Sequence, residues 1–212
     1  GSNYIGSLDG YIYAYRPDGS PKWTPFNTGG LVDTCSPAVG DDGTVYVGSF
    51  SGYLYALDGA TGSLQWQKQV ASGGTVANSP AVAADGSIYV RSNDGFLVAF
   101  TASGSQKWTY PVPGASYSSP VIGPDGTVYI GADDGKLYAV TPSGASKWSA
   151  PFAADSEIYT TPALDAAGNL YFATTSGNNV YSVTPAGALR WQHTIGGACT
   201  SSPALSADGA TL

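Results

Sequence analysis

The side chains that most often perform catalysis are scarce in this 212-residue chain. It contains one histidine, His193, two well-separated cysteines, Cys35 and Cys199, and a single glutamate, Glu157. One histidine cannot supply a metal triad. The chain also has neither a Gly-x-Ser-x-Gly nucleophile elbow nor a phosphate-binding loop. The sequence therefore predicts no catalytic residue, no metal ligand and no cofactor.

Polar and aromatic residues suited to binding are present in segments where the internal repeats of the chain differ. These candidates are Asp33, Asn78, Arg91, Tyr117, Glu157 and Tyr159. An arginine among carboxylates and tyrosines could hold an anionic or sugar-like ligand, or anchor a protein loop. The alternative is that Arg91 only pairs with a nearby carboxylate at the surface, a contact that contributes about 0–1 kcal/mol. Which interpretation applies depends on where the fold places Arg91 relative to the other candidate residues.

Composition restricts the class of fold and of partner. Charged residues make up 11% of the chain, and 29 Gly and 14 Pro are typical of many short strands joined by tight turns. The net charge is −7 and the basic residues form no cluster, so a nucleic-acid partner is not expected. No apolar run reaches the roughly 18 residues that a membrane-spanning helix needs.

The chain is built from repeats of about 42 residues. The five tryptophans lie 40 to 43 residues apart: Trp23, Trp66, Trp108, Trp148 and Trp191. The prolines of five Ser-Pro or Thr-Pro pairs have the same spacing: Pro37, Pro80, Pro120, Pro162 and Pro203. Repeats of this length indicate a solenoid or a propeller.

Each repeat has the pattern of four short strands. In one repeat we predict them, innermost first, at Ser36–Val39, Thr44–Ser49, Tyr53–Leu57 and Leu64–Gln67. Apolar residues alternate with small or polar ones over four to six positions, and no segment has the spacing of an amphipathic helix. Four short strands in a repeat of this length are typical of a β-propeller blade.

Most of the acidic residues belong to predicted turns. Nine aspartates directly precede a glycine: Asp9, Asp18, Asp42, Asp58, Asp85, Asp94, Asp125, Asp134 and Asp208. Asp-Gly suits the positive-φ positions of tight hairpins. Calcium loops are the alternative, but the spaced acidic pattern and distal glutamate of an EF-hand are missing.

The fourth strand of each unit is predicted to form the outer edge of its blade. A cation precedes the tryptophan in four of five units: Lys22, Lys107, Lys147 and Arg190. Strand alternation is expected to bury the indole against a neighbouring blade and to direct the cation to water, which discourages edge-to-edge aggregation.

At these residues the chain resembles a known family. Ala56–Trp66, ALDGATGSLQW, is similar to the tryptophan-docking motif A-x-D-x-x-T-G-x-x-x-W of pyrroloquinoline-quinone-type (PQQ-like) propeller repeats. The other units keep the small residue, the turn glycine and the tryptophan, and the resemblance extends over the whole chain. It implies an all-β propeller of four-stranded antiparallel blades.

The resemblance leaves function open, because such repeats occur in quinoprotein dehydrogenases, an outer-membrane assembly lipoprotein and sensor ectodomains. The resembling dehydrogenases use adjacent cysteines and a calcium-bound quinone in an eight-bladed ring. This chain has separated cysteines and five repeats, so we do not expect an oxidoreductase.

The two ends of the chain are expected to share one blade. Tyr4–Tyr15 aligns with the second and third strands of a repeat, and Ser202–Leu212 aligns with the first strand and the start of the second. We therefore expect residues 1–212 to form a single five-bladed ring that closes through strands from both termini and is monomeric. The alternatives are a fragment of a seven- or eight-bladed propeller and an engineered chain with no function of its own.

The cysteines allow two interpretations. Cys35 and Cys199 lie shortly before the first strands of the first and last units, which are neighbours only in a closed five-bladed ring. A disulfide between them would hold the ring together in an extracytoplasmic protein. The alternative, which the geometry of the two strands favours, is a pair of free thiols that behave as small hydrophobic groups.

Together these features predict a non-catalytic binding or scaffolding module, with an unknown protein or a small polar ligand as partner. The alternative is a lectin-like module, which would repeat one polar and aromatic set in every blade. The location expected from the resemblance is periplasmic, secreted or cell-surface.

Overall fold

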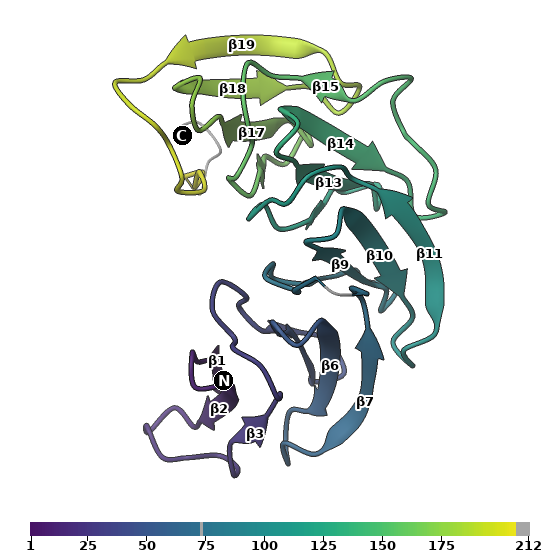
Figure 1. Ribbon diagram of the computed structural model, residues 1–212, viewed down its shortest axis with the longest axis vertical. Helices are drawn as coiled ribbons and strands as arrows, with labels where there is room; N and C mark the ends of the chain where they lie inside the picture. Colours follow the sequence, from purple (N-terminus) through teal and green to yellow (C-terminus); the bar gives the residue numbers. More distant parts are fainter. Residues whose placement is uncertain (73, 207–212) are drawn as a thin grey trace. The chain divides into compact units, whose positions relative to one another are not determined.

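The computed structural model describes residues 1–72 and 74–206, and these residues form an all-β protein without helices. Their strands form five antiparallel sheets, of which four have four strands and one has three (Figure 1). We call these sheets blades 1 to 5 in chain order. They confirm the predicted β-propeller architecture. The chain divides into two compact units, Gly1–Thr109 and Tyr110–Leu212, which are described separately.

The strands of blade 2 lie within two residues of the boundaries expected from the sequence. Blade 1 contains β1 (Asn3–Gly6), β2 (Tyr11–Tyr15) and β3 (Phe26–Asn27). Blade 2 contains β4 (Ala38–Val39), β5 (Thr44–Gly48), β6 (Tyr53–Asp58) and β7 (Leu64–Gln69). Blade 3 contains β8 (Ala81–Val82), β9 (Ile88–Ser92), β10 (Phe96–Phe100) and β11 (Gln106–Pro111). Blade 4 contains β12 (Val121–Ile122), β13 (Val128–Gly131), β14 (Lys136–Val140) and β15 (Phe152–Ala153). Blade 5 contains β16 (Ala163–Leu164), β17 (Leu170–Ala173), β18 (Asn179–Val183) and β19 (Leu189–Thr194).

The core of the first unit lies between consecutive blades. On β5, Val45 and Val47 pack with Ile12 of β2 in one apolar cluster. Tyr46 points to the opposite face of the strand and joins a second cluster with Ile88 of β9. Because successive side chains of a strand alternate between its faces, an inner strand covered by two blades is apolar at nearly every position.

Blades 4 and 5 form the same kind of core in the second unit. Leu137 of β14 packs in one cluster with Phe172 of β17 and Tyr181 of β18. The rings of Phe172 and Tyr181 stack with centroids 5.2 Å apart. These contacts are the repeat-to-repeat packing that the alternation predicts.

Aspartates in the Asp-Gly turns act as local hydrogen-bond acceptors. The Asp42 carboxylate accepts a hydrogen bond from the Thr44 backbone N–H at 2.9 Å, and Asp125 accepts one from the Thr127 N–H at 3.1 Å. Gly43 follows Asp42 with a φ of 84°, a conformation that glycine adopts without steric cost. This geometry confirms the turn interpretation, and no group of three potential metal-ligating side chains occurs among the described residues.

Prolines shorten two of the outer strands, a difference from the uniform outer strand that the repeat predicts. Pro25 directly precedes β3 and Pro151 directly precedes β15, and each of these strands has only two residues. A proline cannot donate a hydrogen bond to the adjacent strand, so the ladder is interrupted there. The tryptophans before these prolines, Trp23 and Trp148, lie in the resulting loops and are 9% exposed.

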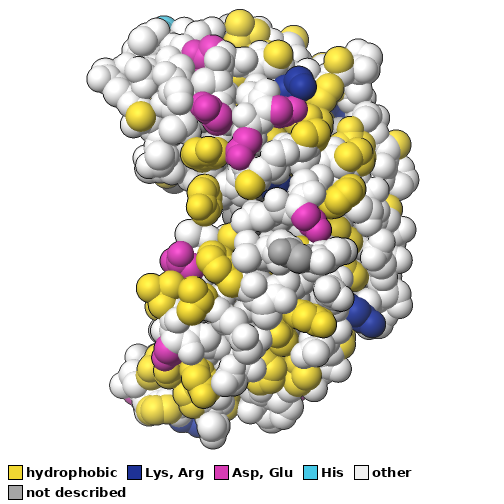
Figure 2. All heavy atoms as spheres, in the orientation of Figure 1, with side chains coloured by type: hydrophobic (Ala, Val, Ile, Leu, Met, Phe, Trp, Pro, Cys, Tyr) yellow, Lys and Arg dark blue, Asp and Glu magenta, His cyan; other side chains and the backbone are white. Residues whose placement is uncertain are grey.

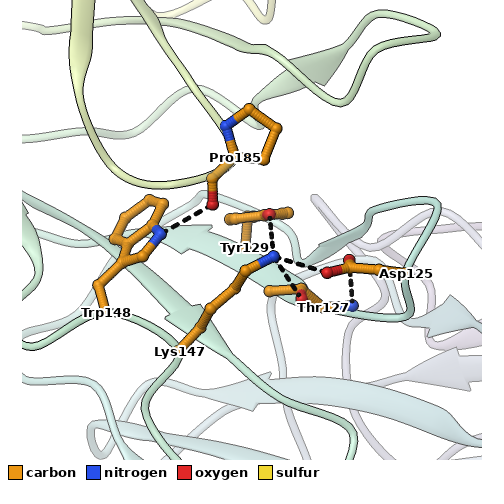
Figure 3. Close-up of polar contacts among 6 residues, drawn as sticks. All are labelled: Asp125, Thr127, Tyr129, Lys147, Trp148 and Pro185. Carbon is orange, nitrogen blue, oxygen red and sulfur yellow. Dashed lines mark hydrogen bonds and ion pairs between the residues drawn. The ribbon is translucent and has the colours of Figure 1, made fainter.

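The outer tryptophans dock on the next blade, as the sequence predicts. The Trp66 indole N–H donates to the carbonyl of Ala102 at 2.9 Å, and the Trp148 indole N–H donates to the carbonyl of Pro185 at 3.0 Å (Figure 3). Each acceptor lies in the turn before the outer strand of the following blade. These two indoles therefore contribute both apolar area and one hydrogen bond to the contact between blades, whereas the Trp23 indole nitrogen is buried without a hydrogen-bond partner among the described residues.

The cations that precede the tryptophans make polar contacts in their own blades, which alternation does not predict; Lys107 and Arg190 are nevertheless exposed to water, whereas Lys22 and Lys147 are half-buried. The Lys147 ammonium lies 2.6 Å from the Asp125 carboxylate, 3.1 Å from the Thr127 hydroxyl and 3.3 Å from the Tyr129 hydroxyl (Figure 3). Its long stem lies across the blade and brings the charge to acceptors on the inner strand and its turn.

The other three cations make similar contacts within their own blades. Lys22 donates to the Tyr4 hydroxyl at 3.0 Å, and Lys107 donates to the Ser87 hydroxyl at 2.7 Å. Arg190 donates to the Tyr171 hydroxyl at 2.9 Å. The cation at this position therefore links the segment around the tryptophan to an inner strand, or to the turn before that strand, of the same blade.

The shared blade at the two ends of the chain stays a prediction. Blade 1 has three strands among the described residues, and its expected fourth strand corresponds to Ser202–Leu212. Ser202–Ser206 is not in a strand, and the remaining six residues of that segment lie outside the described residues.

Candidate functional site

The inner strands end at a face where the loops between blades are tightly packed. A Cβ atom added to Gly48, at the end of β5, would lie 2.3 Å from Cγ1 of Val76. A Cβ on Gly131, at the end of β13, would lie 2.4 Å from Cγ2 of Ile158. These glycines are therefore required because a β-branched side chain of the following loop occupies the space beside the strand.

In three repeats, the side chain two residues before the proline of the Ser-Pro or Thr-Pro pair accepts a hydrogen bond from the last residue of the adjacent inner strand. Ser118 accepts from the Gly131 N–H at 3.0 Å, and Thr160 accepts from the Ala173 N–H at 3.0 Å. In blade 2 this acceptor is the sulfur of Cys35, 3.1 Å from the backbone nitrogen of Gly48. Cys35 therefore takes the place of a hydroxyl residue in a repeated contact.

Both cysteines are free thiols, so the disulfide alternative is not observed. Cys35 is buried, and burial raises the pKa of its thiol to about 12. Cys199 is half-buried, and its sulfur lies 3.4 Å from the carbonyl oxygen of Ser201. Cys35 remains a free, buried thiol because its sulfur accepts the hydrogen bond from the Gly48 N–H inside the loop.

The Ser-Pro and Thr-Pro pairs join neighbouring blades through hydroxyl groups. The Ser36 N–H donates to the Ser79 hydroxyl at 2.9 Å in the first unit. In the second unit, the Ser119 N–H donates to the Thr161 hydroxyl at 3.0 Å, and the Thr161 N–H donates to the Ser202 hydroxyl at 2.9 Å. These bonds explain why a hydroxyl residue precedes the proline, and they hold the loops in place.

The structure separates the six candidate binding residues into buried and accessible ones. Asn78 and Arg91 are 0% exposed, so neither side chain reaches the surface where a ligand was expected. Arg91 lies on β9, whose five residues are all buried, and its Cα pairs with that of Leu97. Asp33 is exposed in the first unit. The expectation of an accessible arginine was wrong because both faces of β9 are covered, so side chains on either face of this strand are buried.

Two of the six candidates are in contact in the second unit, and a third, Glu157, lies on the same loop as one of them. The rings of Tyr117 and Tyr159 meet at 90° with centroids 5.8 Å apart. Tyr117 is 58% exposed, while Tyr159 and Glu157 are half-buried. We call Tyr117, Tyr159 and Glu157 the acid–tyrosine site.

Hydrogen bonds to backbone carbonyl groups connect the loops that carry this site. The Ser116 hydroxyl donates to the Ile158 carbonyl at 3.0 Å, which joins the Tyr117 loop to the Tyr159 loop. The Ile158 N–H donates to the Ala132 carbonyl at 3.1 Å, and the Thr175 N–H donates to the Glu157 carbonyl at 2.9 Å. The loop with Glu157 and Tyr159 is thus held from both sides.

A second set of contacts supports the loop between β17 and β18. The Ser156 hydroxyl accepts hydrogen bonds from the Ser176 N–H at 3.1 Å and the Gly177 N–H at 2.7 Å. Asn179 donates to the Asp155 carboxylate through its side chain. Because side chains and backbone both participate, the site lies on a frame with defined geometry.

The charges around the site affect its titration. Burial is the largest cause that raises the pKa of Tyr159, followed by the negative charges of Asp133 and Glu157. The pKa of Glu157 is lowered by a hydrogen bond from its own backbone N–H and by the Ser176 side chain. Glu157 therefore carries a negative charge next to a neutral tyrosine at neutral pH.

Sequence reasoning missed Asp133 and Ser156. Asp133 belongs to the pair Asp133-Asp134, of which only Asp134 is needed for the turn, since it accepts from the Lys136 N–H at 3.1 Å. Asp133, which the turn does not require, could therefore have been identified from the sequence as a further acidic residue near the site. No sequence pattern marks Ser156, whose importance depends on the opposing loop.

The chain is similar in fold to several solved structures. BamB from Moraxella catarrhalis superposes with a TM-score of 0.68 at 21% identity, over 90% of this chain and 69% of that one. The computationally designed Ika8 protein superposes with a TM-score of 0.79 at 16% identity, over 94% of this chain and 61% of that one. Virginiamycin B lyase from Staphylococcus aureus superposes with a TM-score of 0.75 at 15% identity, over 92% of this chain and 67% of that one. No curated protein matches the sequence.

The sequence also matches one family model over residues 8–208, nearly its whole length. That model is described as outer membrane protein assembly factor BamB. The match agrees with the tryptophan-docking repeats, the four-stranded blades and the docked indoles described above. The chain belongs to this family of PQQ-like β-propellers.

Proposed function

We propose that this chain is a non-catalytic protein-binding module and that its partner contacts the acid–tyrosine site. The observation that carries the proposal is Tyr117, which is 58% exposed although it packs against Tyr159 on hydrogen-bonded loops. An exposed tyrosine on a rigid frame provides a large contact area with little loss of conformational freedom, and tyrosines are enriched among residues that dominate protein interfaces.

The sequence positions of the two tyrosines favour a single partner site over a lectin-like set of equivalent sites. Tyr117 and Tyr159 each lie three residues before the proline of a Ser-Pro or Thr-Pro pair, in adjacent repeats. The corresponding residues of the other repeats are Thr34, Ala77 and Thr200. A module that binds one small ligand per blade would need the same side chains in every repeat.

The family description supports the scaffolding part of this proposal and its location. An assembly factor of the outer membrane acts by contacting other proteins, and we extend this role and an extracytoplasmic location, whether periplasmic, secreted or cell-surface, to the present chain. The described residues include no helix long and apolar enough to cross a membrane.

A photo-crosslinking amino acid at position 117 tests the proposal in cells of the source organism. We expect one defined crosslinked protein from this position, and we expect its yield to fall when Tyr159 is changed to Ala. The matched control carries the crosslinker at Leu189, which is 52% exposed on the outer strand β19. Identical products from positions 117 and 189, or none from position 117, would rule the site out.

A cofactor test addresses the enzymatic alternative. Added pyrroloquinoline quinone with calcium is expected to leave the melting temperature unchanged, because a ligand stabilises a protein only if it binds the folded state. A rise in the melting temperature would instead favour a cofactor-binding role.

A further inference from the structure

One face of blade 1 is built like a contact between blades but is open to solvent. Ile5 of β1 is 57% exposed, and its cross-strand neighbour Tyr13 of β2 is half-buried. The corresponding pair of blade 2, Val47 and Tyr55, is buried because blade 1 packs on it, with Ile12 in the same apolar cluster. Figure 2, in the orientation of Figure 1, shows hydrophobic side chains at the surface over the strands of blade 1.

The turn that precedes the tryptophan of a blade receives the tryptophan of the blade before it. A glycine four residues before the blade's own tryptophan marks this place. A Cβ atom on Gly104 would lie 2.8 Å from Cδ2 of Trp66, and one on Gly187 would lie 2.9 Å from Cδ2 of Trp148. Gly19 has the same position in blade 1, yet no atom of the described residues lies within 4 Å of a Cβ there.

The same turn supplies a hydrogen-bond acceptor. The docked indoles donate to the carbonyl group two residues before the glycine, that of Ala102 at 2.9 Å and that of Pro185 at 3.0 Å. The residue at this position in blade 1 is Pro17, which is exposed and whose carbonyl accepts no hydrogen bond from the described residues. Pro17 and Gly19, which we call the tryptophan seat, thus combine a free acceptor with space for an indole ring.

Trp191 of blade 5 is oriented like a docked tryptophan. Its ring lies 5.8 Å from that of Tyr171 on the inner strand, as the Trp148 ring lies 5.8 Å from that of Tyr129. Trp148 also donates a hydrogen bond to the next blade, whereas the Trp191 indole N–H donates to no residue that the structure describes. Trp191 is therefore held in advance in the orientation that docking needs, which lowers the entropic cost of binding.

The free seat and the free tryptophan are the two halves of a contact that the chain already makes. Trp66 docks on the following blade through its ring and one hydrogen bond, beside an apolar cluster formed by two neighbouring blades. Both halves of this contact are present and unused in one chain. The partner with the matching surface is therefore a second copy, which extends an existing interface and needs no new type of contact.

We propose that copies of this chain associate, with Trp191 of one copy in the tryptophan seat of a second copy and its indole N–H donating to the Pro17 carbonyl. Two different surfaces meet in this contact, so it is heterologous. The face with Ile5 is covered at the same time, as blade 1 covers the corresponding face of blade 2. The inference uses none of the residues of the acid–tyrosine site and does not depend on the proposed function.

The mass of the full chain as a function of concentration tests the inference. Light scattering from about 1 µM to about 1 mM detects both strong and weak association. We expect the average mass to rise from that of one copy to that of two or more, because a heterologous contact can close in a small ring or continue. The mass of one copy over the whole range would overturn the inference and favour the single closed ring that the sequence predicts.

Gly19→Asn blocks the seat and has a matched control. Asparagine tolerates the positive φ of this turn, and its side chain would take the place of the indole. We expect the dissociation constant to rise about 5- to 150-fold, the factor that corresponds to overpacking. Gly43→Asn is the control, because Gly43 also has a positive φ and open space around its Cβ. Equal dissociation constants for the two variants would contradict the proposed seat.

A mixing experiment separates loss of the contact from loss of folding. Trp191→Ala lacks the docking ring and Gly19→Asn lacks the seat, so neither variant should associate alone. In an equal mixture, the intact Trp191 of the Gly19→Asn chain can occupy the intact seat of the Trp191→Ala chain. We expect the mixture to form a complex of two copies, which requires both variants to be folded. If the mixture keeps the mass of one copy while the parent associates, other surfaces make the contact and the inference is wrong.

Discussion

The sulfur of Cys35 lies 3.1 Å from the backbone nitrogen of Gly48 and accepts its hydrogen bond. Hydroxyl groups perform this role in blades 4 and 5, where Ser118 and Thr160 accept from the corresponding strand ends. A thiol is a weaker acceptor than a hydroxyl. The same loop geometry is thus maintained by different side-chain chemistry in different repeats.

This equivalence predicts that Cys35→Ser preserves stability, while Cys35→Val destabilises the protein. Serine restores the acceptor found in the other blades, whereas valine leaves the Gly48 N–H buried without a partner, at a cost of about 1–3 kcal/mol. Urea unfolding of both variants measures the difference. Equal stability of the two variants would show that the sulfur acts only by filling space.

The two thiols are also expected to react at different rates. Burial raises the pKa of the Cys35 thiol to about 12, so this group is protonated and shielded at neutral pH, while Cys199 is half-buried. Because the thiolate is the reactive form, maleimide is expected to modify Cys199 well before Cys35 in the folded protein. Mass spectrometry of the time course checks this order, and denatured protein is the control in which both should react.

Gly131→Ala is expected to destabilise the second unit because the new Cβ would lie 2.4 Å from Cγ2 of Ile158. Overpacking of this kind costs about 1–3 kcal/mol. Combining it with Ile158→Ala removes the clashing group, so the double variant should lose less stability than the sum of the single variants. Gly196→Ala is the control, since no atom lies within 4 Å of a Cβ at that position. Strict additivity in urea unfolding would contradict the clash.

The contact between Lys147 and Asp125 predicts an acid-dependent loss of stability. The hydrogen bond from Lys147 is the largest cause that lowers the pKa of Asp125, from an ordinary value of 3.8 to about 2. The unfolded chain therefore binds the proton more readily than the folded one, so the stabilisation is complete above pH 3.8 and declines as pH falls toward 2.

Melting temperatures of the parent and of Asp125→Asn between pH 5 and about 2 measure this contribution. The parent should lose more stability than Asp125→Asn over this interval, although solvent screens the contact because the Asp125 side chain is 55% exposed. Asp41→Asn is a useful control, since Asp41 lies in an exposed turn of the first unit. If the melting temperatures of the parent and of Asp125→Asn fall in parallel with pH, the contact with Lys147 does not cause the acid-dependent loss of stability.

Local features of the fold could be predicted from sequence. Alternation over Thr44–Gly48 identifies β5, and the Asp42-Gly43 turn that precedes it follows from the conformational freedom of glycine. The spacing of tryptophans and prolines identifies the repeat, and the docking of Trp148 on the next blade agrees with it. These features depend on neighbours in sequence, or on the same contact made in successive repeats.

Only the tertiary structure decided which candidates are accessible. The sequence places Arg91 and Tyr117 on the same face, at positions where the repeats differ, yet Arg91 is 0% exposed and Tyr117 is 58% exposed. The meeting of Tyr117 and Tyr159 across 42 residues likewise depends on how two loops pack. Strand and turn preferences act over a few residues, whereas burial depends on contacts made by distant segments. The sequence by itself determined the repeat, its strands and its turns, and the packing of loops from different repeats decided which candidate side chains are exposed.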